Sequence, residues 1–375
     1  MFANTKGLLD KYERFFKVPA FDLSVYYQGK EVYRDFRGVS DEQGSALNGK
    51  ELYNLYSASK PVTCAAALLL LQEGKISLND DVASYLPAFK DVKVAKAGAL
   101  VKAEKPMKIV HLFTMTGGMS LTVKGAELEE GIRETEGKCP TVEMMNYLAK
   151  IPLAFEPGES WRYSLCHDVL AAIVEVVSGK RFGLFAKERI FDPLGMVDTT
   201  FLLPTEKVAS VCAQYRYFED KGYVNVGQAI QDFKFGSAYE SGGAGLISSV
   251  DDYRKFLEGL RTGKILNAET RALMQKDMLT DTQRQACWVA EGYGYGLGVR
   301  VPKKGGVRTD YGWGGAAGAY VALDEKNEIS ISYAQHVLTS KNSGLNAGLI
   351  EAVKLDLGLD GDASAVWRGD GSHLA

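Results

Sequence analysis

Near both ends of the chain, hydrophobic and polar residues follow the pattern of β-strands. Residues 21–27 alternate at a period of two, and a turn at Gln28-Gly29 separates them from a similar stretch at residues 31–36. This arrangement predicts an antiparallel hairpin. Close to the C-terminus, short stretches rich in β-forming residues return at residues 294–299, 319–323 and 329–333.

Helical periodicity marks the N-terminal residues and most of the middle of the chain. The expected helices lie at residues 4–16, 106–115, 141–150, 168–177, 182–190, 253–260 and 346–357. Strands at both ends with helices between them predict an α+β fold. In this fold, one antiparallel β-sheet is formed from both termini and flanked by helices, and a mostly helical lobe is inserted into it.

The lobes can be assigned to segments of the sequence. We expect one catalytic domain over residues 1–375, in which residues 1–56 plus 288–360 form the sheet lobe and residues 57–287 form the mainly helical lobe. Residues 361–375 are polar and contain glycine, so we expect a loose tail.

One apolar run is too continuous for a surface helix. Residues 64–71 read Cys-Ala-Ala-Ala-Leu-Leu-Leu-Leu and Gly74 follows, so we expect a buried helix that stops there. The motif Ser57-Ala58-Ser59-Lys60 lies at its head, and nowhere else in the sequence is a serine followed three residues later by lysine. Residues three apart share a helix face, so the hydroxyl of Ser57 and the amine of Lys60 should be neighbours.

This spacing is suited to nucleophilic catalysis. A desolvated lysine can take the proton of a serine or stabilise its alkoxide. Backbone N–H groups at a helix N-terminus favour a developing oxyanion. A four-residue pattern with two free positions also arises by chance, but its place at the head of a core helix favours a function. The motif therefore predicts the reactive centre of an acyl-enzyme hydrolase.

Such a centre needs a second proton carrier, and two residues are candidates. Tyr163 follows a Pro-Gly pair in a loop before the helix expected at residues 168–177. A phenol beside an ammonium gives up its proton more easily than an isolated one. The alternative is a tyrosine that packs its ring and hydrogen-bonds its hydroxyl. His167 is the rival base, although a lone histidine at a helix start is commonly structural.

A glycine-rich stretch at residues 311–318 can supply a second oxyanion donor. Glycines let the backbone of an edge strand approach a ligand, so the N–H of Ala316 could point at a substrate carbonyl. The alternative is a glycine-rich bulge or turn around a core tryptophan, Trp313. Another glycine cluster, at residues 240–245, is expected to border the cleft without taking part directly.

Composition excludes several classes of function. The 375 residues carry a formal net charge of −3 with mixed signs, so no basic surface for nucleic acid or an anionic membrane is expected. Five cysteines and four histidines are scattered without metal-ligand spacing, and phosphate-binding glycine loops are missing. We therefore expect no metal and no cofactor. The N-terminal residues lack the apolar stretch of a secretion signal, which predicts a cytoplasmic protein.

Three motifs together resemble the serine β-lactamase and penicillin-binding superfamily, in its class C-like branch. They are Ser57-Ala58-Ser59-Lys60, Tyr163-Ser164-Leu165 and Trp313-Gly314-Gly315, in the family's order. Residues 112–119 and 242–256 match as well, and the resemblance covers roughly residues 8–357. The branch also holds family VIII carboxylesterases, D-stereospecific aminopeptidases and lovastatin-type acyltransferases.

The resemblance implies a role for each motif. Ser57 would be the nucleophile, with Lys60 and Tyr163 as its proton-transfer pair. The N–H groups of Ser57 and Ala316 would form the oxyanion hole. The stretch Trp313-Gly314-Gly315 would contact the substrate, a small-molecule ester or amide.

Two departures from the β-lactamase pattern point towards esters. Leu165 stands where that pattern has asparagine, and Trp313-Gly314-Gly315 replaces Lys-Thr-Gly. A tryptophan cannot attract the carboxylate of a β-lactam, but its apolar face can hold an acyl or alcohol group. Both departures resemble family VIII esterases, so we expect a serine carboxylesterase that forms an acyl-Ser57 intermediate. The alternatives are β-lactam or D-amino acid amide hydrolysis, acyl transfer at the same centre, or a non-catalytic binding module.

Overall fold

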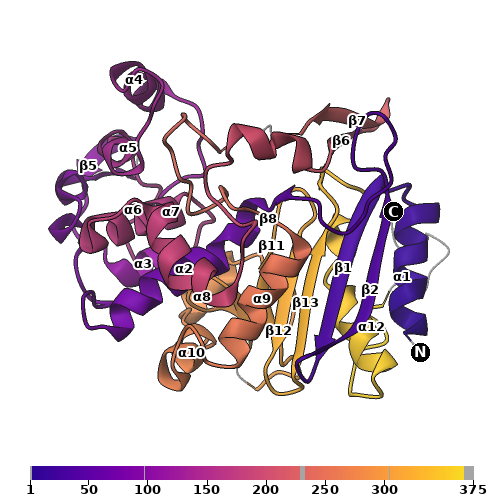
Figure 1. The fold of residues 1–375 in the computed structure, drawn as a ribbon. Helices are drawn as coiled ribbons and strands as arrows, with labels where there is room; N and C mark the ends of the chain where they lie inside the picture. Colours follow the sequence, from indigo (N-terminus) through magenta and orange to yellow (C-terminus); the bar gives the residue numbers. More distant parts are fainter. Residues whose placement is uncertain (1, 97, 229–232, 304, 367–375) are drawn as a thin grey trace.

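A seven-stranded antiparallel sheet forms the centre of the protein (Figure 1). The computed structural model describes residues 2–96, 98–228, 233–303 and 305–366. In spatial order the strands are β2 (Lys30–Gly38), β1 (Ala20–Tyr27), β13 (Ile329–Ala334), β12 (Tyr320–Asp324), β11 (Tyr311–Gly314), β10 (Arg300–Pro302) and β9 (Tyr293–Tyr295). Strand β1 pairs with β13, so both ends of the chain build the same sheet, as expected.

The turn between β1 and β2 explains why the chain begins with a hairpin. Gln28 and Gly29 both have positive φ angles, 52° and 75°, which a tight two-residue hairpin turn requires. Side chains of β1 then alternate between the faces of the sheet. Val25 lies opposite Ile331 of β13, and both belong to the core on the side of the terminal helices.

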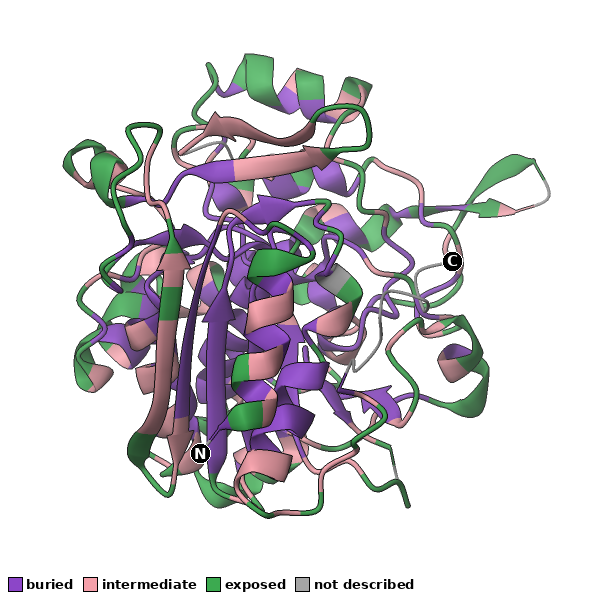
Figure 2. Ribbon diagram, turned by 90° about the vertical axis from the view of Figure 1, so that its right-hand side faces the viewer, coloured by how far each residue is buried: buried purple, intermediate pink, exposed green. Residues whose placement is uncertain are grey.

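Helices cover both faces of the sheet and create two cores. Helices α1 (Ala3–Arg14) and α12 (Gly348–Asp356) pack together on one face (Figure 1). Helices α2 (Ser59–Gln72) and α9 (Val250–Arg261) contact strands on the other side. Figure 2 shows buried strands at the centre of the molecule and helices with exposed outer faces around them.

The larger core continues from the sheet into the helical lobe, so that α2 is buried along almost its whole length. The other helices of this lobe are α3 (Ile109–Phe113), α4 (Ala126–Glu134), α5 (Thr141–Leu148), α6 (Cys166–Ser178), α7 (Phe182–Ala186), α8 (Asp192–Leu194), α10 (Ala268–Met274) and α11 (Asp281–Ala286). The α+β fold expected from the sequence is confirmed.

The middle of the chain is less purely helical than the sequence suggested. It contributes β4 (Lys93–Lys96), β5 (Ala99–Lys102), β6 (Gln214–Phe218), β7 (Gly222–Gly227) and β8 (Ile247–Ser248) to small accessory sheets. Their partners include β3 (Tyr53–Asn54) and β14 (Val337–Leu338). These short pairings depend on distant segments, so local periodicity does not reveal them.

The first part of the expected C-terminal tail is packed rather than loose. The backbone N–H of Asp362 donates to Glu351 of α12 at 2.7 Å, and Val366 is buried in the core beside the terminal helices. The remainder of the expected tail, residues 367–375, lies outside the described residues. No helix in the described ranges is long and apolar enough to cross a membrane.

Candidate active site

Ser57 lies in a short turn that delivers the chain into α2. The 3-10 turn Tyr56–Ala58 precedes the α-helix, so Ser57 stands just before its first turn. Tyr56 adopts a left-handed φ of 47°, a conformation that costs energy for a bulky residue. Ser59 secures this turn, because its hydroxyl donates to the carbonyl of Tyr56 at 2.5 Å and accepts from the N–H of Leu246 at 2.9 Å.

Lys60 follows in the first turn of α2 and is buried, with 2% of its surface exposed. Its Nζ donates to the carbonyl oxygen of Gly243 at 2.7 Å and lies 4.5 Å from the centre of the Tyr163 ring. The glycine cluster at residues 240–245 therefore holds the lysine, a role that the sequence analysis did not assign to it. Since lysine is long and flexible, this anchor fixes where its amine lies.

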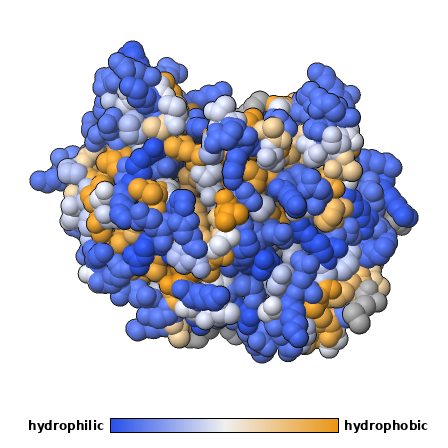
Figure 3. Space-filling model, in the orientation of Figure 1, coloured by the Kyte–Doolittle hydropathy of each residue, from blue (hydrophilic) through white to orange (hydrophobic). Residues whose placement is uncertain are grey.

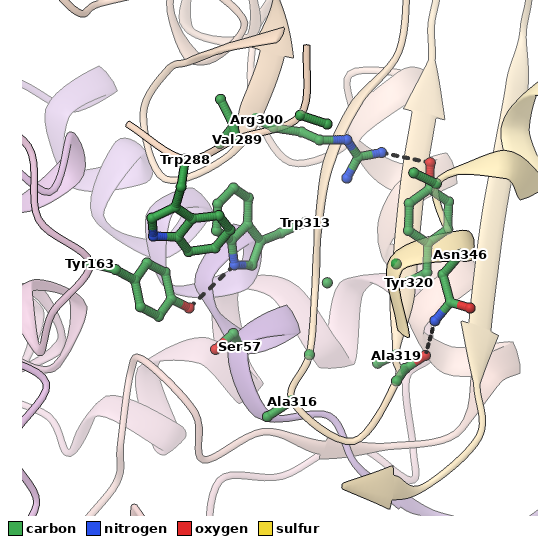
Figure 4. A pocket seen from close by; sticks show the side chains of 16 residues that line it. Ser57, Tyr163, Trp288, Val289, Arg300, Trp313, Ala316, Ala319, Tyr320 and Asn346 are labelled. Carbon is green, nitrogen blue, oxygen red and sulfur yellow. Dashed lines mark hydrogen bonds between the residues drawn. The ribbon is translucent and has the colours of Figure 1, made fainter. Parts of the chain in front are cut away.

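Tyr163 approaches from the loop that leads into α6. Its ring stacks on Trp313 with 5.9 Å between ring centres, and its hydroxyl accepts a hydrogen bond from Trp313 Nε1 at 3.3 Å (Figure 4). Ser57 and Tyr163 line the same cavity, and Ser57 and Lys60 line a smaller one behind it. Within the described residues, the Ser57 hydroxyl makes no hydrogen bond to Lys60 or Tyr163.

The glycine-rich turn after β11 lies against the turn that carries Ser57. A Cβ atom added to Gly315 would lie 2.1 Å from the carbonyl oxygen of Leu55, so glycine is required for this contact. The next residue, Ala316, is exposed and lines the cavity beside Ser57 (Figure 4). The geometry brings together the two backbone segments that were expected to form an oxyanion hole.

The cavity over Ser57 has a volume of about 450 Å³. Its lining includes the expected residues Trp313, Gly314 and Gly315, and also Trp288, Val289, Arg300 and Tyr320, which the sequence analysis missed. Trp288 is 63% exposed and its ring centre lies 5.4 Å from that of Tyr163. An isolated tryptophan carries no motif, so its place at the cavity could not be found from the sequence.

Arg300 is the charged member of this lining. Its Nη2 donates to Asp310 Oδ2 at 2.9 Å. It also donates to the hydroxyl of Tyr320 at 2.8 Å (Figure 4). The ion pair with the buried Asp310 offsets its positive charge. Figure 3 shows that apolar residues reach the surface in patches among hydrophilic ones, including over the helical lobe on the left.

His167, the rival base, is buried in α6 and lines neither of these two cavities. Burial lowers the pKa of its imidazole well below the ordinary value, so the ring is neutral. A Cβ atom on Gly298 would lie 2.8 Å from its Nε2, which shows how closely the turn after β9 packs on it. Its position indicates a structural role. Among the described residues, no group of three or more His, Cys, Asp or Glu side chains could hold a metal ion.

Comparisons with known proteins agree with this geometry. The family model described as Beta-lactamase matches residues 10–353. An uncharacterized protein of Mycobacterium tuberculosis is 30% identical over 328 residues, with 80% of each chain covered. Esterase EstB of Burkholderia gladioli is 28% identical over 342 residues, which cover 82% of this chain and 83% of EstB.

Solved structures with the same fold are more distant in sequence. One of them is EstCE1, described as a hydrolase with promiscuous acyltransferase activity, with a TM-score of 0.74 and 24% sequence identity. The match covers 93% of this chain and 97% of EstCE1. A mutant of simvastatin synthase from Aspergillus terreus has a TM-score of 0.78 and 21% identity, with 94% of each chain covered. At these identities the similarity concerns the fold alone.

Proposed function

The chain belongs to the Beta-lactamase family, and from this premise we propose that it is a serine carboxylesterase acting on small to medium esters. The observation that carries the proposal is the position of Ser57 and Tyr163 in one cavity beside the indole of Trp313. Lys60 is buried directly behind them. The similarity to the esterase EstB supports the same substrate class.

In the proposed mechanism, Ser57 Oγ attacks the ester carbonyl carbon and its proton passes to the Lys60–Tyr163 pair. The N–H groups of Ser57 and Ala316 stabilise the oxyanion of the tetrahedral intermediate. Collapse of this intermediate breaks the bond to the alkoxide, which leaves with the proton held by the pair. Water then attacks the acyl-enzyme in the same way, releasing the carboxylic acid and restoring the hydroxyl of Ser57.

The walls of the cavity favour esters over β-lactams. Trp313 and Trp288 present apolar rings near Ser57, where a β-lactam would need a cation for its carboxylate. Leu165, which stands at the position of the family's asparagine, is buried and also apolar. The cation of the lining, Arg300, is already paired with Asp310.

Acyl transfer to an alcohol is a second candidate, and the size of the cavity favours it. A volume of about 450 Å³ lies within the range of small-molecule sites. It leaves room for an alcohol beside a short acyl group. Among the relatives is a methylbutanoyltransferase of Penicillium citrinum, 28% identical over 232 residues. The amidase and β-lactamase reactions, and a binding module without catalysis, remain alternatives with the same fold.

Hydrolysis of short-chain p-nitrophenyl esters tests the proposal. We expect turnover by the wild-type protein and a loss of at least about a thousand-fold in kcat for Ser57→Ala. Intact-mass measurement after brief exposure to an activated ester should show one acyl group on Ser57. Absence of turnover, or full turnover by Ser57→Ala, would refute the esterase assignment.

A substrate panel separates the alternatives. Nitrocefin, a D-alanyl amide, and an ester mixed with an alcohol should each be compared with the p-nitrophenyl esters by kcat/KM. A higher rate with the β-lactam than with every ester would make the protein a β-lactamase. Treatment with a fluorophosphonate covers the remaining case, because a protein that never labels at Ser57 is a binding module.

A further inference from the structure

The cavity over Ser57 has a second end, where the side chains of Arg300 and Tyr320 meet (Figure 4). Arg300 pairs with Gly312 of β11, and residues opposite each other in an antiparallel pair point to the same face of the sheet. Trp313 follows Gly312 in the strand and therefore points to the other face. The cavity thus extends beyond the face that carries the indole. We call its far part the distal end, lined by Arg300, Tyr320, Asn346 and Ala347.

The glycine-rich segment after β11 connects the distal end with Ser57. Gly314, Gly315 and Gly318 line the cavity and place no side chains in it. A Cβ atom added to Gly314 would meet the carbonyl oxygen of Ala319 at 3.2 Å and no other atom within 4 Å outside its chain neighbours. The space above this glycine is therefore open. A substrate bound at Ser57 can extend over the bare backbone to the distal end, within a total volume of about 450 Å³.

Arg300 presents unused hydrogen-bond donors to the distal end. Its side chain is only 9% exposed, and Nη2 makes its hydrogen bonds to Asp310 and Tyr320. Nη1 has no hydrogen-bond partner among the described residues, yet it is not closed off from solvent. A guanidinium carries five N–H donors and no acceptor, so Nη1 offers two N–H groups. A ligand in the cavity can satisfy them with an acceptor oxygen.

The carboxylate of Asp310 determines what kind of acceptor fits. It is fully buried, and it accepts hydrogen bonds from Arg300 at 2.9 Å and from the hydroxyl of Tyr293 at 2.5 Å. These contacts fix the guanidinium and compensate its charge. A bound anion would give up its hydration and also be repelled by this carboxylate. A neutral carbonyl oxygen meets neither cost, so the distal end is suited to an uncharged acceptor.

Tyr320 provides a further donor at the same place. Its hydroxyl accepts from Arg300 Nη2 at 2.8 Å, and it donates its own proton to no described residue. The neighbouring amide of Asn346 is already engaged, because Nδ2 donates to the carbonyl of Gly318 at 3.0 Å and Oδ1 accepts from Asn342. The groups left for a ligand at the distal end are therefore N–H and O–H donors.

We propose that the distal end is a substrate subsite for a neutral carbonyl oxygen, so that the protein prefers esters with a ketone or a second ester carbonyl far from the bond it cleaves. This inference rests on the proposed function and names its substrate class. Arg300 Nη1 and the Tyr320 hydroxyl donate to the distant oxygen, while Ser57 attacks the scissile carbonyl. The apolar chain between them lies beside Trp313 and over the glycine backbone.

Pairs of esters that differ only by one carbonyl group test this subsite. On the acyl side, p-nitrophenyl 4-oxopentanoate, 5-oxohexanoate and 6-oxoheptanoate are compared with the pentanoate, hexanoate and heptanoate. On the alcohol side, oxoalkyl butyrates are compared with alkyl butyrates of equal length by pH-stat titration. The readout is the ratio of kcat/KM within each pair. Comparing this ratio between proteins cancels the intrinsic reactivity of the two esters.

Arg300→Lys is the informative variant, because it keeps a cation beside Asp310 but has no second nitrogen to offer. In at least one pair we expect the ratio to fall about ten-fold in Arg300→Lys, and to fall in Tyr320→Phe as well. Arg308→Lys is the matched control. Arg308 also lies over the ring of Tyr293, at 5.6 Å, and is ion-paired, but it does not line the cavity. An equal fall in Arg308→Lys, or an unchanged ratio in Arg300→Lys, would overturn the proposal.

A charged probe tests the preference for a neutral group. Mono-p-nitrophenyl adipate ends in a carboxylate, and we expect a lower kcat/KM for it than for the 5-oxohexanoate. A preference for this anion that Arg300→Lys abolishes would make the distal end an anion site and overturn the proposal.

Plain esters separate the subsite from the esterase assignment. Turnover of p-nitrophenyl hexanoate without any ratio that depends on Arg300 would reject the subsite and leave the esterase assignment standing. If no ester is turned over, the esterase assignment fails, and calorimetric binding of methyl 6-oxoheptanoate and methyl heptanoate to Ser57→Ala still tests the subsite. Tighter binding of the oxo ester, lost when Arg300→Lys is added, would support it, and equal binding would overturn it.

Discussion

At the residue scale, the parts of the site that a short motif carries could be predicted from the sequence. Ser57 and Lys60 lie on adjoining turns, so their spacing alone brought them together. Trp288 could not be predicted in this way. It reaches the site because the segment before β9 lies over the cavity. Tertiary packing decides its position.

Gly315→Ala tests whether the close approach of two backbone segments is needed for catalysis. The new Cβ would lie 2.1 Å from the carbonyl of Leu55, so the turn that carries Ala316 must move away from Ser57. We expect a loss of about 10²–10³ in kcat, the usual cost of one oxyanion donor, with little change in melting temperature. Gly7→Ala is the matched control, since a Cβ there meets no atom within 4 Å. Unchanged kcat in Gly315→Ala would remove Ala316 from the oxyanion hole.

At the element scale, long periodic segments were predicted well and interrupted ones were not. The hairpin of β1 and β2 and the helices α1, α6 and α9 lie where periodicity indicated. Of the single strand expected at residues 294–299, only the first two residues belong to a strand, β9; residues 296–299 form a turn that leads into β10. Gly298 in that turn has a φ of 81°, and a Cβ there would lie 2.0 Å from Cys64 Sγ. The strand breaks because the sheet edge must contact α2, which its own sequence does not show.

His336 connects segments that are far apart in the sequence, and it makes their packing sensitive to pH. It precedes β14, its Nδ1 hydrogen-bonds the carbonyl of Cys212 at 2.8 Å, and its Nε2 accepts from the N–H of Asn54 in β3 at 3.2 Å. Burial lowers its pKa from 6.5 to about 4. Between about pH 6.5 and pH 4, this histidine therefore binds a proton in the unfolded chain but not in the folded protein. The stability that the neutral ring contributes is lost as pH falls towards 4, by at most about 3 kcal/mol.

Urea unfolding of wild type and His336→Gln between pH 7.5 and 4.5 measures this contribution. We expect the wild type to be the more stable at pH 7.5, because glutamine does not reproduce both hydrogen bonds of the ring. The difference between the two proteins should shrink as pH falls, since only the wild type loses the histidine contribution. His111, whose pKa burial also lowers to about 4, is present in both proteins and cancels. Parallel stability curves would contradict the assignment.

At the scale of the whole molecule, the two lobes share one core. Trp313 and Val321 of the sheet belong to the same hydrophobic cluster as Val62 of α2 and Leu170 of α6. We therefore propose that the sheet lobe and the helical lobe form one domain and unfold together. Far-ultraviolet and near-ultraviolet circular dichroism should give the same transition midpoint. Two separate midpoints would instead indicate lobes that fold independently.

The ends of the chain close this domain through α1 and α12. Helix α1 has no side-chain cap of its own at Phe2. Asp356, at the end of α12, accepts hydrogen bonds from the backbone N–H groups of Asn4 and Thr5 at 2.9 and 2.8 Å. A carboxylate in this position satisfies free N–H groups and complements the positive end of the helix dipole. The C-terminal helix thus caps the N-terminal one.

Asp356→Asn should lower the free energy of unfolding by about 2 kcal/mol, since charge-assisted hydrogen bonds contribute more than neutral ones. Esterase kcat should not change, because Asp356 lies at the C-terminal end of α12, whereas the cavity meets this helix only at its N-terminal cap, Ala347. Asp360→Asn is the matched control: Asp360 is exposed, and its side chain makes no hydrogen bond or ion pair to any described residue. Equal stability of Asp356→Asn and wild type in urea would show that α1 docks through its apolar side chains alone. A fall in kcat without a loss of stability would instead mean that the contact between α1 and α12 influences the geometry of the active site through the sheet.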